Sequence, residues 1–309
     1  MTWSWVPPEL VALIEERAGA GVESVEGANF GFSPGFAGVV TFANGERQFL
    51  KVMSATRDPW SIDVNRREAE VLALLPRSVP APALLWAVEA GEWFAFATEC
   101  VEGEHPRPQH NEDHARAMWN VLTQLSRVPA PPGLPPFHEY QHDIFERWQS
   151  LASAPDRAAR LASLGANGEW ISGALGRLVE LERDAIEASK GDVLVHGDLR
   201  ADNALIAAGT VVIVDWPYAS RGAPWLDLAG LLPAFEMNGG GRARAAFRAH
   251  PLASDVSVAE ERAFVAALAG YFAVSSTDPP VPAISGLREF QRAQAIPALA
   301  WLREIVDSA

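Results

Sequence analysis

The sequence contains a single cysteine, Cys100, among its 309 residues. One thiol cannot form an intramolecular disulfide and cannot supply a site that needs several thiolates. No stretch approaches the roughly 18 uninterrupted apolar residues of a membrane-spanning helix. The first residues, MTWSWVPPELVALIEERAG, lack the basic start and the cleavage site of a secretory signal. The sequence therefore predicts a cytosolic protein without a membrane partner.

Basic residues are also scarce: 25 lysines and arginines stand against 39 acidic residues, which gives a net charge of −14. A nucleic-acid partner needs a basic surface, so the charge argues against this class of ligand and we expect no nucleic-acid partner. The acidic balance favours a cationic small substrate, although net charge bears first on solubility. Hydrophobic residues make up 49% of the chain and charged residues 21%, as is typical of a globular protein.

The first hundred residues read as short strands with one helix among them. In GVVTFANGERQFLKVM two β-rich runs flank Asn44-Gly45, a strong hairpin signal. Residues 65–76, NRREAEVLALLP, have the apolar spacing of an amphipathic helix that ends at Pro76. A second hairpin is expected around residues 89–92. The segment therefore predicts a small antiparallel sheet with one helix.

After VEGEHPRP the chain becomes rich in alanine and leucine with helical spacing, in residues 115–128, 156–190, 260–272 and 287–308. One β-rich island, residues 193–216, interrupts these helices. We therefore predict a two-lobed α+β fold. A small β-rich lobe with one helix would span residues 1–101, and a larger, mostly helical lobe would span residues 102–309. A cleft between lobes is a common place for a ligand.

A polar group of residues lies inside that island, in VLVHGDLRADNALI. Burying so many polar side chains between apolar flanks is costly unless each is paired or used. Asp198 is followed after four residues by Asn203, and Asp215 ends a β-branched run twelve residues later. This is the spacing of the catalytic loop and strand-end aspartate of phosphoryl-transfer enzymes.

The residue types suit that chemistry. A hydroxyl that attacks a γ-phosphate must be oriented and relieved of its proton, which is a task for a carboxylate free of metal. Mg²⁺ that bridges the phosphates needs hard oxygen ligands, and an asparagine carbonyl and a second carboxylate supply them.

HGDLRADN followed by VDW resembles the aminoglycoside phosphotransferase family, a kinase-like group that modifies antibiotics and small hydroxylated metabolites. The resemblance covers most of the chain and implies a protein-kinase-like fold. It makes Asp198 the catalytic base or orienting group, and makes Asn203 and Asp215 the metal ligands. By the same resemblance, His196 anchors the loop and Asp227, in PWLDLA, braces it.

The nucleotide-binding parts follow in the family's order. FLKV places Lys51 where the family's lysine holds the α- and β-phosphates, and RREAEVL places Glu68 where that lysine's partner lies. Glu70 is the competitor if the register is different. FATECVEG resembles the hinge that offers backbone groups to adenine, through the carbonyl of Thr98 and the N–H of Cys100.

The expected phosphate-covering loop is GANFGFSPGFAG, residues 27–38. It is rich in glycine but lacks the strict G-x-G-x-x-G of protein kinases. Ser33, Gly35 and Gly38 are its best candidates for contact with phosphate, through backbone N–H groups and one hydroxyl.

Arg200 has two interpretations. It lies two residues after Asp198, where protein kinases carry a lysine that touches the transferred phosphate, so its charge can serve the same end. The alternative is a local ion pair with Asp202, and the sequence does not choose between the two.

A rival motif occurs in FHEYQHDIF, where His138, Glu139 and His142 spell H-E-x-x-H. On a helix this pattern would present two imidazoles to zinc. The motif directly follows the proline-rich PAPPGLPP and has no obvious third ligand downstream. We therefore interpret it as the opening of a helix in the large lobe, where it can line the substrate side.

The leading hypothesis is an ATP- and Mg²⁺-dependent phosphotransferase that acts on a hydroxyl of a small molecule, such as an aminoglycoside or another antibiotic. GTP is the alternative nucleotide. Other hypotheses are a kinase of a metabolite, such as a choline-like alcohol, a sugar or an amino-acid derivative, and a nucleotide-binding pseudokinase without turnover. Fold alone does not choose the acceptor, and the sequence gives no oligomeric state.

Overall fold

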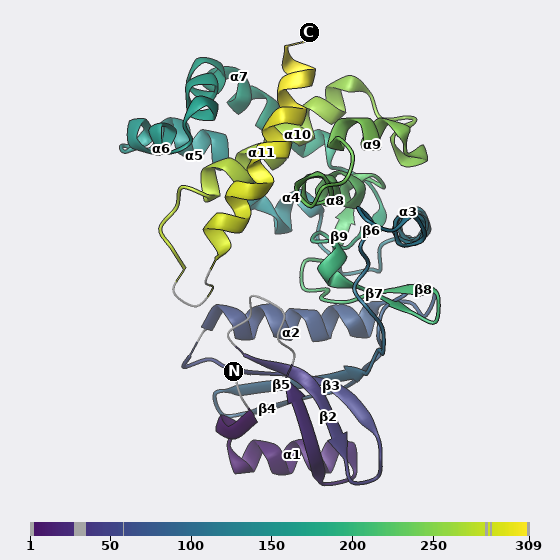
Figure 1. The fold of residues 1–309 in the computed structure, drawn as a ribbon. Coiled ribbons are helices and arrows are strands. Elements are labelled where there is room, and N and C mark those ends of the chain that lie inside the picture. Colours follow the sequence, from purple (N-terminus) through teal and green to yellow (C-terminus); the bar gives the residue numbers. More distant parts are fainter. Residues whose placement is uncertain (1–2, 28–34, 58, 282–283, 285, 308–309) are drawn as a thin grey trace. The chain divides into compact units, whose positions relative to one another are not determined.

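The computed structural model describes residues 3–27, 35–57, 59–281, 284 and 286–307. The chain forms two compact units (Figure 1). Unit 1 comprises residues 1–104, 205–217 and 281–285, and unit 2 comprises residues 105–204, 218–280 and 286–309. The N-terminal unit therefore includes two later segments of the chain. The predicted boundary between residues 101 and 102 assigned both of them to the second lobe.

Unit 1 is built on a five-stranded antiparallel sheet with the order β1-β2-β3-β5-β4. Its strands are β1 (Val22–Gly27), β2 (Phe36–Phe42), β3 (Arg47–Ser54), β4 (Leu84–Ala90) and β5 (Trp93–Glu99). Both expected hairpins are present, β2–β3 and β4–β5. The first turns at Gly45, whose φ of +84° suits a residue without a Cβ.

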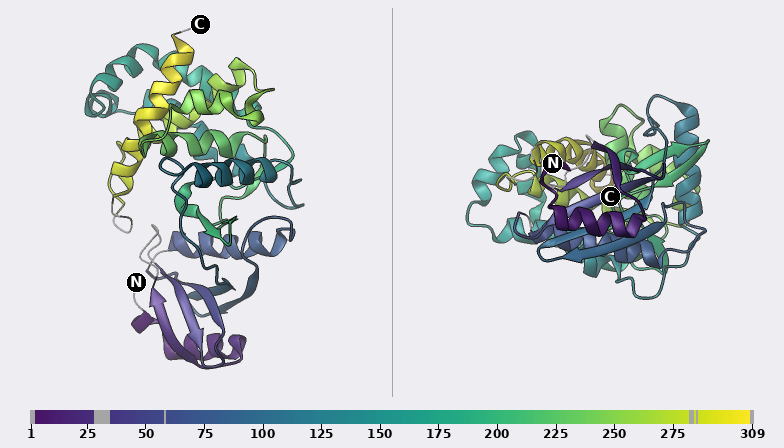
Figure 2. Two further views of the ribbon diagram at one scale, coloured as in Figure 1. Left: turned by 45° about the vertical axis from the view of Figure 1, so that its right-hand side comes forward. Right: turned by 90° about the horizontal axis from the view of Figure 1, so that it is seen from below.

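Two helices cover opposite faces of this sheet, α1 (Pro8–Ala18) and α2 (Pro59–Leu74) (Figures 1 and 2). A 3-10 turn, η1 (Trp3–Trp5), precedes α1. One helix was predicted in this segment, and α1, whose Leu10 and Ile14 are buried in the core of the sheet, was not. The expected helix begins at Pro59, six residues earlier than predicted, because proline is well tolerated in a first turn.

A later hairpin completes unit 1. It is formed by β7 (Ala204–Ala207) and β8 (Thr210–Ile213). Glu104 and Ile206 exchange backbone hydrogen bonds of 3.3 and 2.8 Å, and the N–H of Ile213 donates to the carbonyl of Pro80. These contacts bring Asp215, which follows β8, into the same unit as Lys51.

Unit 2 is mostly helical. Its α-helices are α3 (Glu112–Leu125), α4 (Phe137–Tyr140), α5 (Arg147–Ser153), α6 (Arg157–Ser163), α7 (Ala166–Ala188), α8 (Leu226–Met237), α9 (Ala243–Ala249), α10 (Val258–Ser275) and α11 (Leu287–Val306). Short 3-10 turns lie among them, η2 (His142–Phe145), η3 (Ala201–Asn203) and η4 (Pro251–Ala253). The expected helix over residues 156–190 is interrupted at Gly165, which has φ +59°.

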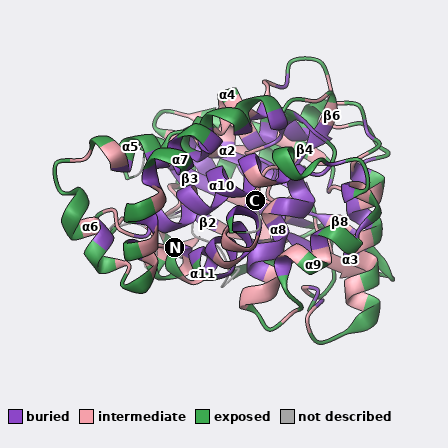
Figure 3. Ribbon diagram, turned by 90° about the horizontal axis from the view of Figure 1, so that it is seen from above, coloured by how far each residue is buried: buried purple, intermediate pink, exposed green. Residues whose placement is uncertain are grey.

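The core of unit 2 surrounds α10, which is buried along most of its length and packs against α7 and α11 (Figure 3). A two-stranded ribbon, β6 (Val193–Val195) and β9 (Ser220–Gly222), lies among the helices. The C-terminal end of β6 leads directly into His196, so this ribbon presents the polar loop. In the part of the chain that the structure describes, no helix is long and apolar enough to cross a membrane.

Candidate functional site

A buried cation lies between two carboxylates in unit 1. Nζ of Lys51, on β3, donates to Oε2 of Glu68 on α2 at 2.6 Å and to Oδ1 of Asp215 at 2.8 Å. The side chains of Lys51 and Glu68 are 15% and 5% exposed, whereas that of Asp215 is 39% exposed. Glu70, the competing residue, is exposed on another side of α2. The structure therefore joins three of the predicted residues into one charged cluster.

The two carboxylates control the charge on this lysine. Burial alone would lower the pKa of the Lys51 ammonium, but Asp215 and Glu68 outweigh it and raise that pKa above its usual value. Burial, with a smaller contribution from Asp215, raises the pKa of the Glu68 carboxyl, and Lys51 opposes that shift. Lys51 is therefore a largely buried group that keeps its positive charge.

The backbone around Asp215 is held in an unusual conformation. Asp215 has φ +66°, a left-handed value that is uncommon for a residue with a side chain and that often marks a functional position. The N–H of Trp216 donates to Glu68. Nε of Arg67 donates to the carbonyl of Pro217 at 3.0 Å. Consecutive residues of α2 thus fix the segment that carries Asp215.

Arg67 was not among the predicted site residues. It stands next to Glu68 in the RREAEVL motif, but an arginine on a helix is usually a solvated surface charge. Its contact with Pro217 joins residues 150 positions apart. The sequence held no signal for it beyond this adjacency.

The two residues predicted to form the hinge, Thr98 and Cys100, lie in different settings. Thr98 is buried inside β5, in register with Phe49 of β3 and Leu84 of β4. Cys100 follows the end of β5 and is partly exposed, and burial raises the pKa of its thiol. A hollow of about 630 Å³ lies beside it, lined by residues 46–48, Leu85, 99–102 and Ala207. That volume is within the range of small-molecule sites.

The predicted glycine-rich loop is shorter than expected at its C-terminal end. β2 begins at Phe36, so Gly38 lies inside the strand, in register with Gly27 and Leu50. A Cβ on Gly38 would collide with the carbonyl oxygen of Glu26, so close packing of the two strands already explains this glycine.

The other two loop candidates are placed differently. Gly35 is buried just before β2, where a Cβ would lie 2.7 Å from the carbonyl oxygen of Val52. Ser33 lies outside the described residues.

In unit 2 the chain turns sharply after β6, and buried groups hold the turn. Asp227 on α8 accepts two backbone hydrogen bonds, from the N–H of His196 at 2.8 Å and from that of Gly197 at 2.9 Å. The N–H of Asp198 donates to Nδ1 of the fully buried His196 at 3.3 Å. The scaffold positions expected for His196 and Asp227 agree with these contacts.

Asp198 lies at the centre of a second cluster. Its Oδ1 accepts a hydrogen bond from Nη1 of Arg200, and its Oδ2 accepts one from Nδ2 of Asn203 at 3.2 Å. Arg200 also makes two hydrogen bonds of 3.0 Å to Asp202 and lies over the ring of Phe290. The structure thus shows the local ion pair that was one of the two interpretations of Arg200, together with a contact to Asp198.

Burial of Asp227 makes the stability of the folded protein depend on pH. It raises the pKa of the Asp227 carboxyl to about 6, although the N–H groups of His196 and Gly197 oppose the shift. The folded state binds the proton of the Asp227 carboxyl more tightly than the unfolded state does. Protonated Asp227 therefore stabilises the fold fully below about pH 4, and this contribution to the free energy of unfolding is lost as the pH rises through about 6. The change amounts to about 3 kcal/mol.

Asp227→Asn removes this titration. Comparing urea unfolding of the variant and the wild type at several pH values, we expect the free-energy difference, wild type minus variant, to fall by about 3 kcal/mol between pH 4 and 7. A difference that is constant over this range would contradict the assignment.

The H-E-x-x-H residues do not lie on one helix. α4 ends at Tyr140, Gln141 interrupts the helical backbone, and His142 opens η2. His138 and His142 therefore do not share a helical face. Within the described ranges, no group of three or more histidine, cysteine, aspartate or glutamate residues is arranged to hold a metal ion. The geometry gives no support to the zinc interpretation.

Six of the predicted residues thus fall into two clusters. Lys51, Glu68 and Asp215 lie together in unit 1, and Asp198, Arg200 and Asn203 lie together in unit 2. The side-chain nitrogen of Asn203 is used by Asp198, so its oxygen is the atom available to a cation. Asp215 uses Oδ1 for Lys51 and is partly exposed. Both residues therefore fit the hard-oxygen chemistry of Mg²⁺.

Two units of this kind, with a buried lysine–glutamate pair in one and an Asp-x-x-x-x-Asn loop in the other, define a kinase-like phosphotransferase. A model of the phosphotransferase enzyme family matches residues 39–268, and the chain belongs to this family. The predicted family, two-lobed α+β fold and enzyme class are confirmed. No curated protein matches the sequence.

Several solved structures share the fold. A choline kinase, LicA from Streptococcus pneumoniae, is 17% identical, with coverage of 94% of this chain and 99% of that chain and a TM-score of 0.58. LicA has also been crystallised with AMP. A macrolide 2′-phosphotransferase from Brachybacterium faecium is 16% identical, covering 96% and 98%, with a TM-score of 0.51. An aminoglycoside 3′-phosphotransferase of type VIII is 20% identical, covering 85% and 97%, with a TM-score of 0.51.

Proposed function

We propose that this protein transfers the γ-phosphoryl group of ATP to a hydroxyl of a small molecule. The observation that carries the proposal is the buried cluster of Lys51, Glu68 and Asp215. Burying the charged side chains of Lys51 and Glu68 is costly unless they serve a ligand or one another. A lysine fixed by a helix glutamate is the part that positions the triphosphate in kinases. The AMP complex of LicA supports an adenine nucleotide.

In this proposal Asp198 orients the acceptor hydroxyl and takes its proton. Asn203 and Asp215 would hold Mg²⁺, which supplies charge neutralisation on the phosphates when bound. Arg200, fixed by Asp202, places a guanidinium beside Asp198, where positive charge stabilises negative charge that develops on the transferred group. Catalysis then consists mainly of positioning and electrostatics.

The remaining nucleotide contacts are also proposals. The N–H of Cys100, and the carbonyl of Thr98 from within β5, would face adenine. Of the three predicted loop residues, Gly35 keeps its proposed role: its backbone N–H, just before β2, would face the phosphates. GTP is the alternative donor, because backbone contacts at the hinge do not depend on side-chain identity.

The chain offers an unusually clean test of the nucleotide site, because it contains two lysines, Lys51 and Lys190. An acyl-phosphate derivative of ATP transfers its acyl group to a nearby lysine amine and releases ATP. We expect peptide mass spectrometry to find the acyl group on Lys51. Unmodified ATP at ten times its Kd should reduce this labelling about tenfold.

Lys190 is the internal control for this labelling. It is exposed and pairs with Glu187 at the end of α7, so its labelling should be slow and insensitive to ATP. Equal labelling of both lysines, or labelling of Lys51 that ATP does not reduce, would contradict a nucleotide site at Lys51.

For the acceptor we propose a hydroxylated cationic small molecule, with an aminoglycoside as the leading candidate. The net charge of −14 supports this choice, and so do the exposed carboxylates Glu139, Asp143 and Glu146 in unit 2. The structural neighbours act on choline, macrolides and aminoglycosides, so metabolite alcohols belong to the same test. Expression in an antibiotic-sensitive bacterium should raise the inhibitory concentration of the true substrate. Unchanged sensitivity to a broad panel would favour a metabolite kinase.

A further inference from the structure

Gln141 is the residue that interrupts the helical backbone between α4 and η2. Its side-chain Nε2 donates a hydrogen bond of 3.0 Å to the carbonyl oxygen of Gly197. Gly197 directly precedes Asp198. The H-E-x-x-H segment therefore contacts the turn that carries Asp198, and it does so through Gln141 and not through its histidines.

The peptide group between Gly197 and Asp198 is held at both of its polar atoms. The carbonyl of Gly197 and the N–H of Asp198 belong to the same planar group. Gln141 holds its oxygen, and Nδ1 of His196 accepts its N–H at 3.3 Å. Asp227 holds the two preceding N–H groups. With both ends of the peptide fixed, the Cα of Asp198 is fixed in place, and the directions in which its side chain can leave the backbone are restricted.

The space around Gly197 shows how closely the turn is enclosed. Gly197 has φ +83°, and a Cβ there would lie 2.6 Å from the carbonyl oxygen of Tyr218 and 2.9 Å from Nε2 of Gln141. The ring of Tyr218 also lies 6.4 Å from that of Tyr140, the neighbour of Gln141. The amide of Gln141 thus forms one wall of the turn and Tyr218 forms another.

The segment that carries Gln141 is anchored at its start to the ribbon that presents the turn. The N–H of Arg221, on β9, donates to the carbonyl of Pro135 at 2.9 Å. β9 in turn pairs with β6 through Ser220 and Val195. The donor and the acceptor of the Gln141 contact are therefore held by the same two strands.

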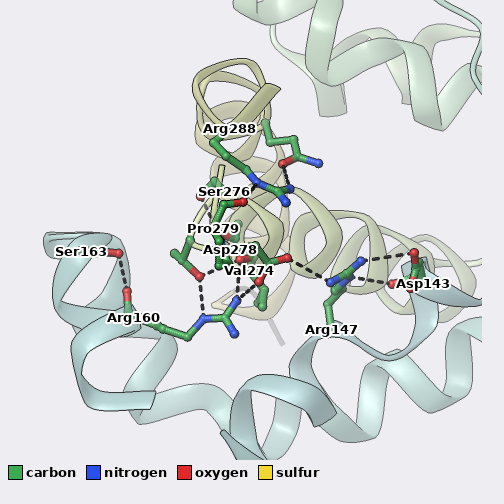
Figure 4. A network of polar contacts seen from close by, with 12 residues as sticks. Asp143, Arg147, Arg160, Ser163, Val274, Ser276, Asp278, Pro279 and Arg288 are labelled. Atoms are coloured by element: carbon green, nitrogen blue, oxygen red, sulfur yellow. Dashed lines mark hydrogen bonds and ion pairs between the residues drawn. The ribbon is translucent and has the colours of Figure 1, made fainter. Parts of the chain in front are cut away.

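The other end of this segment is fixed by Arg147. Its Nε donates to the carbonyl of Asp143 at 3.2 Å, and its guanidinium also pairs with the side chain of Asp143. The same guanidinium contacts Asp278, in the turn after α10, at 3.3 Å (Figure 4). Gln141 thus lies between two anchored points of the chain.

We propose that Gln141 is a positioning residue for phosphoryl transfer: it fixes the peptide plane before Asp198 and thereby aims the Asp198 carboxylate at the acceptor hydroxyl. The inference rests on the proposed function of Asp198. Small errors in the placement of a reacting group are expensive, and a shift of about 1 Å can cost about 100-fold in rate.

Three variants test this role. Gln141→Met keeps the length of the side chain but removes the donor, so kcat should fall about 10- to 100-fold while the KM for ATP stays within about twofold. Gln141→Glu places a carboxylate against the carbonyl of Gly197 and should lower kcat further. The control is Gln149→Met on α5, which loses only exposed contacts to Ser153 and Arg183 and should match the wild type.

Turnover is measured as ADP release from ATP and Mg²⁺, with water as the acceptor if no better one has been found. The midpoint of unfolding is measured in parallel. The proposal is supported if kcat falls from the wild type to Gln141→Met and further to Gln141→Glu while KM and the midpoint of unfolding stay unchanged. Methionine and glutamate variants with wild-type kcat would overturn it, and so would a KM or midpoint that changes as much as kcat.

Hydrogen exchange separates failure of this inference from failure of the proposed function. If the wild type releases no ADP with any acceptor of a broad panel, the proposed function fails, and exchange in the peptide covering residues 193–203 still tests the contact. Faster exchange there in Gln141→Met, with other peptides unchanged, supports positioning of the turn by Gln141. Unchanged exchange overturns it.

Discussion

Replacing Asp198 with asparagine is expected to lower kcat by about 10²- to 10⁴-fold while ATP still binds, because the variant loses the general base but keeps its shape. Asp198 is held by Arg200 on one oxygen and by Asn203 on the other. The amide of the variant would turn its NH₂ toward one of these two donors. The measurement is steady-state turnover, with nucleotide affinity determined separately by titration.

The matched control for this variant is Asp192→Asn. Asp192 lies on the same stretch of chain, is 90% exposed and pairs with Arg221 at 3.2 Å. Exposed ion pairs contribute about 0–1 kcal/mol, so turnover and stability should remain near the wild type. Normal turnover by Asp198→Asn would exclude Asp198 as the base, and equal losses in both variants would point to a general disturbance of the fold.

Replacing Lys51 with methionine is expected to have the largest effect on nucleotide affinity. The change removes the cation that would hold the triphosphate, and truncating one partner of a buried charged pair costs about 2–5 kcal/mol. This corresponds to a loss of about 30- to 4,000-fold in affinity for ATP, measurable by titration. Glu68 would also lose its cation, so stability should fall by about 3–5 kcal/mol.

Lys190→Met is the matched control for Lys51, because these are the two lysines of the chain. It removes an exposed pair with Glu187, which contributes about 0–1 kcal/mol. If both variants bound ATP with wild-type affinity, the cluster around Lys51 would be structural and the nucleotide would bind elsewhere.

Much of the site could be predicted because its residues are close in sequence or stand in motifs of fixed order. Asp198, Asn203 and Asp215 lie within 18 positions of one another, and the hairpin turn at Gly45 depends on local backbone geometry. Lys51 and Glu68 were identified by order alone. Their contact depends on α2 packing on the sheet, which the helical periodicity around Glu68 indicated.

The rest could not be predicted because it depends on contacts distant in sequence. Arg67 reaches Pro217, and Gln141 reaches Gly197, across 150 and 56 positions. The type of a residue does not indicate which residue distant in sequence it will contact. α1 was missed because its two buried residues, Leu10 and Ile14, bound an apolar run of five residues that is too short to show a helical periodicity. Gly38 was placed in the loop because a glycine needed for close strand packing looks the same in sequence as a phosphate-binding one.

The most direct test of the central claim is acceptor-dependent release of ADP from ATP and Mg²⁺, measured over a panel of aminoglycosides, macrolides, choline and sugars, with ATP binding followed in the same samples. We expect at least one hydroxylated acceptor to stimulate ADP release by the wild type and to gain one phosphoryl group by mass. We expect Asp198→Asn to bind ATP but to lose most of this stimulation. ATP binding by the wild type without ADP release across the whole panel would contradict phosphoryl transfer and indicate a nucleotide-binding pseudokinase.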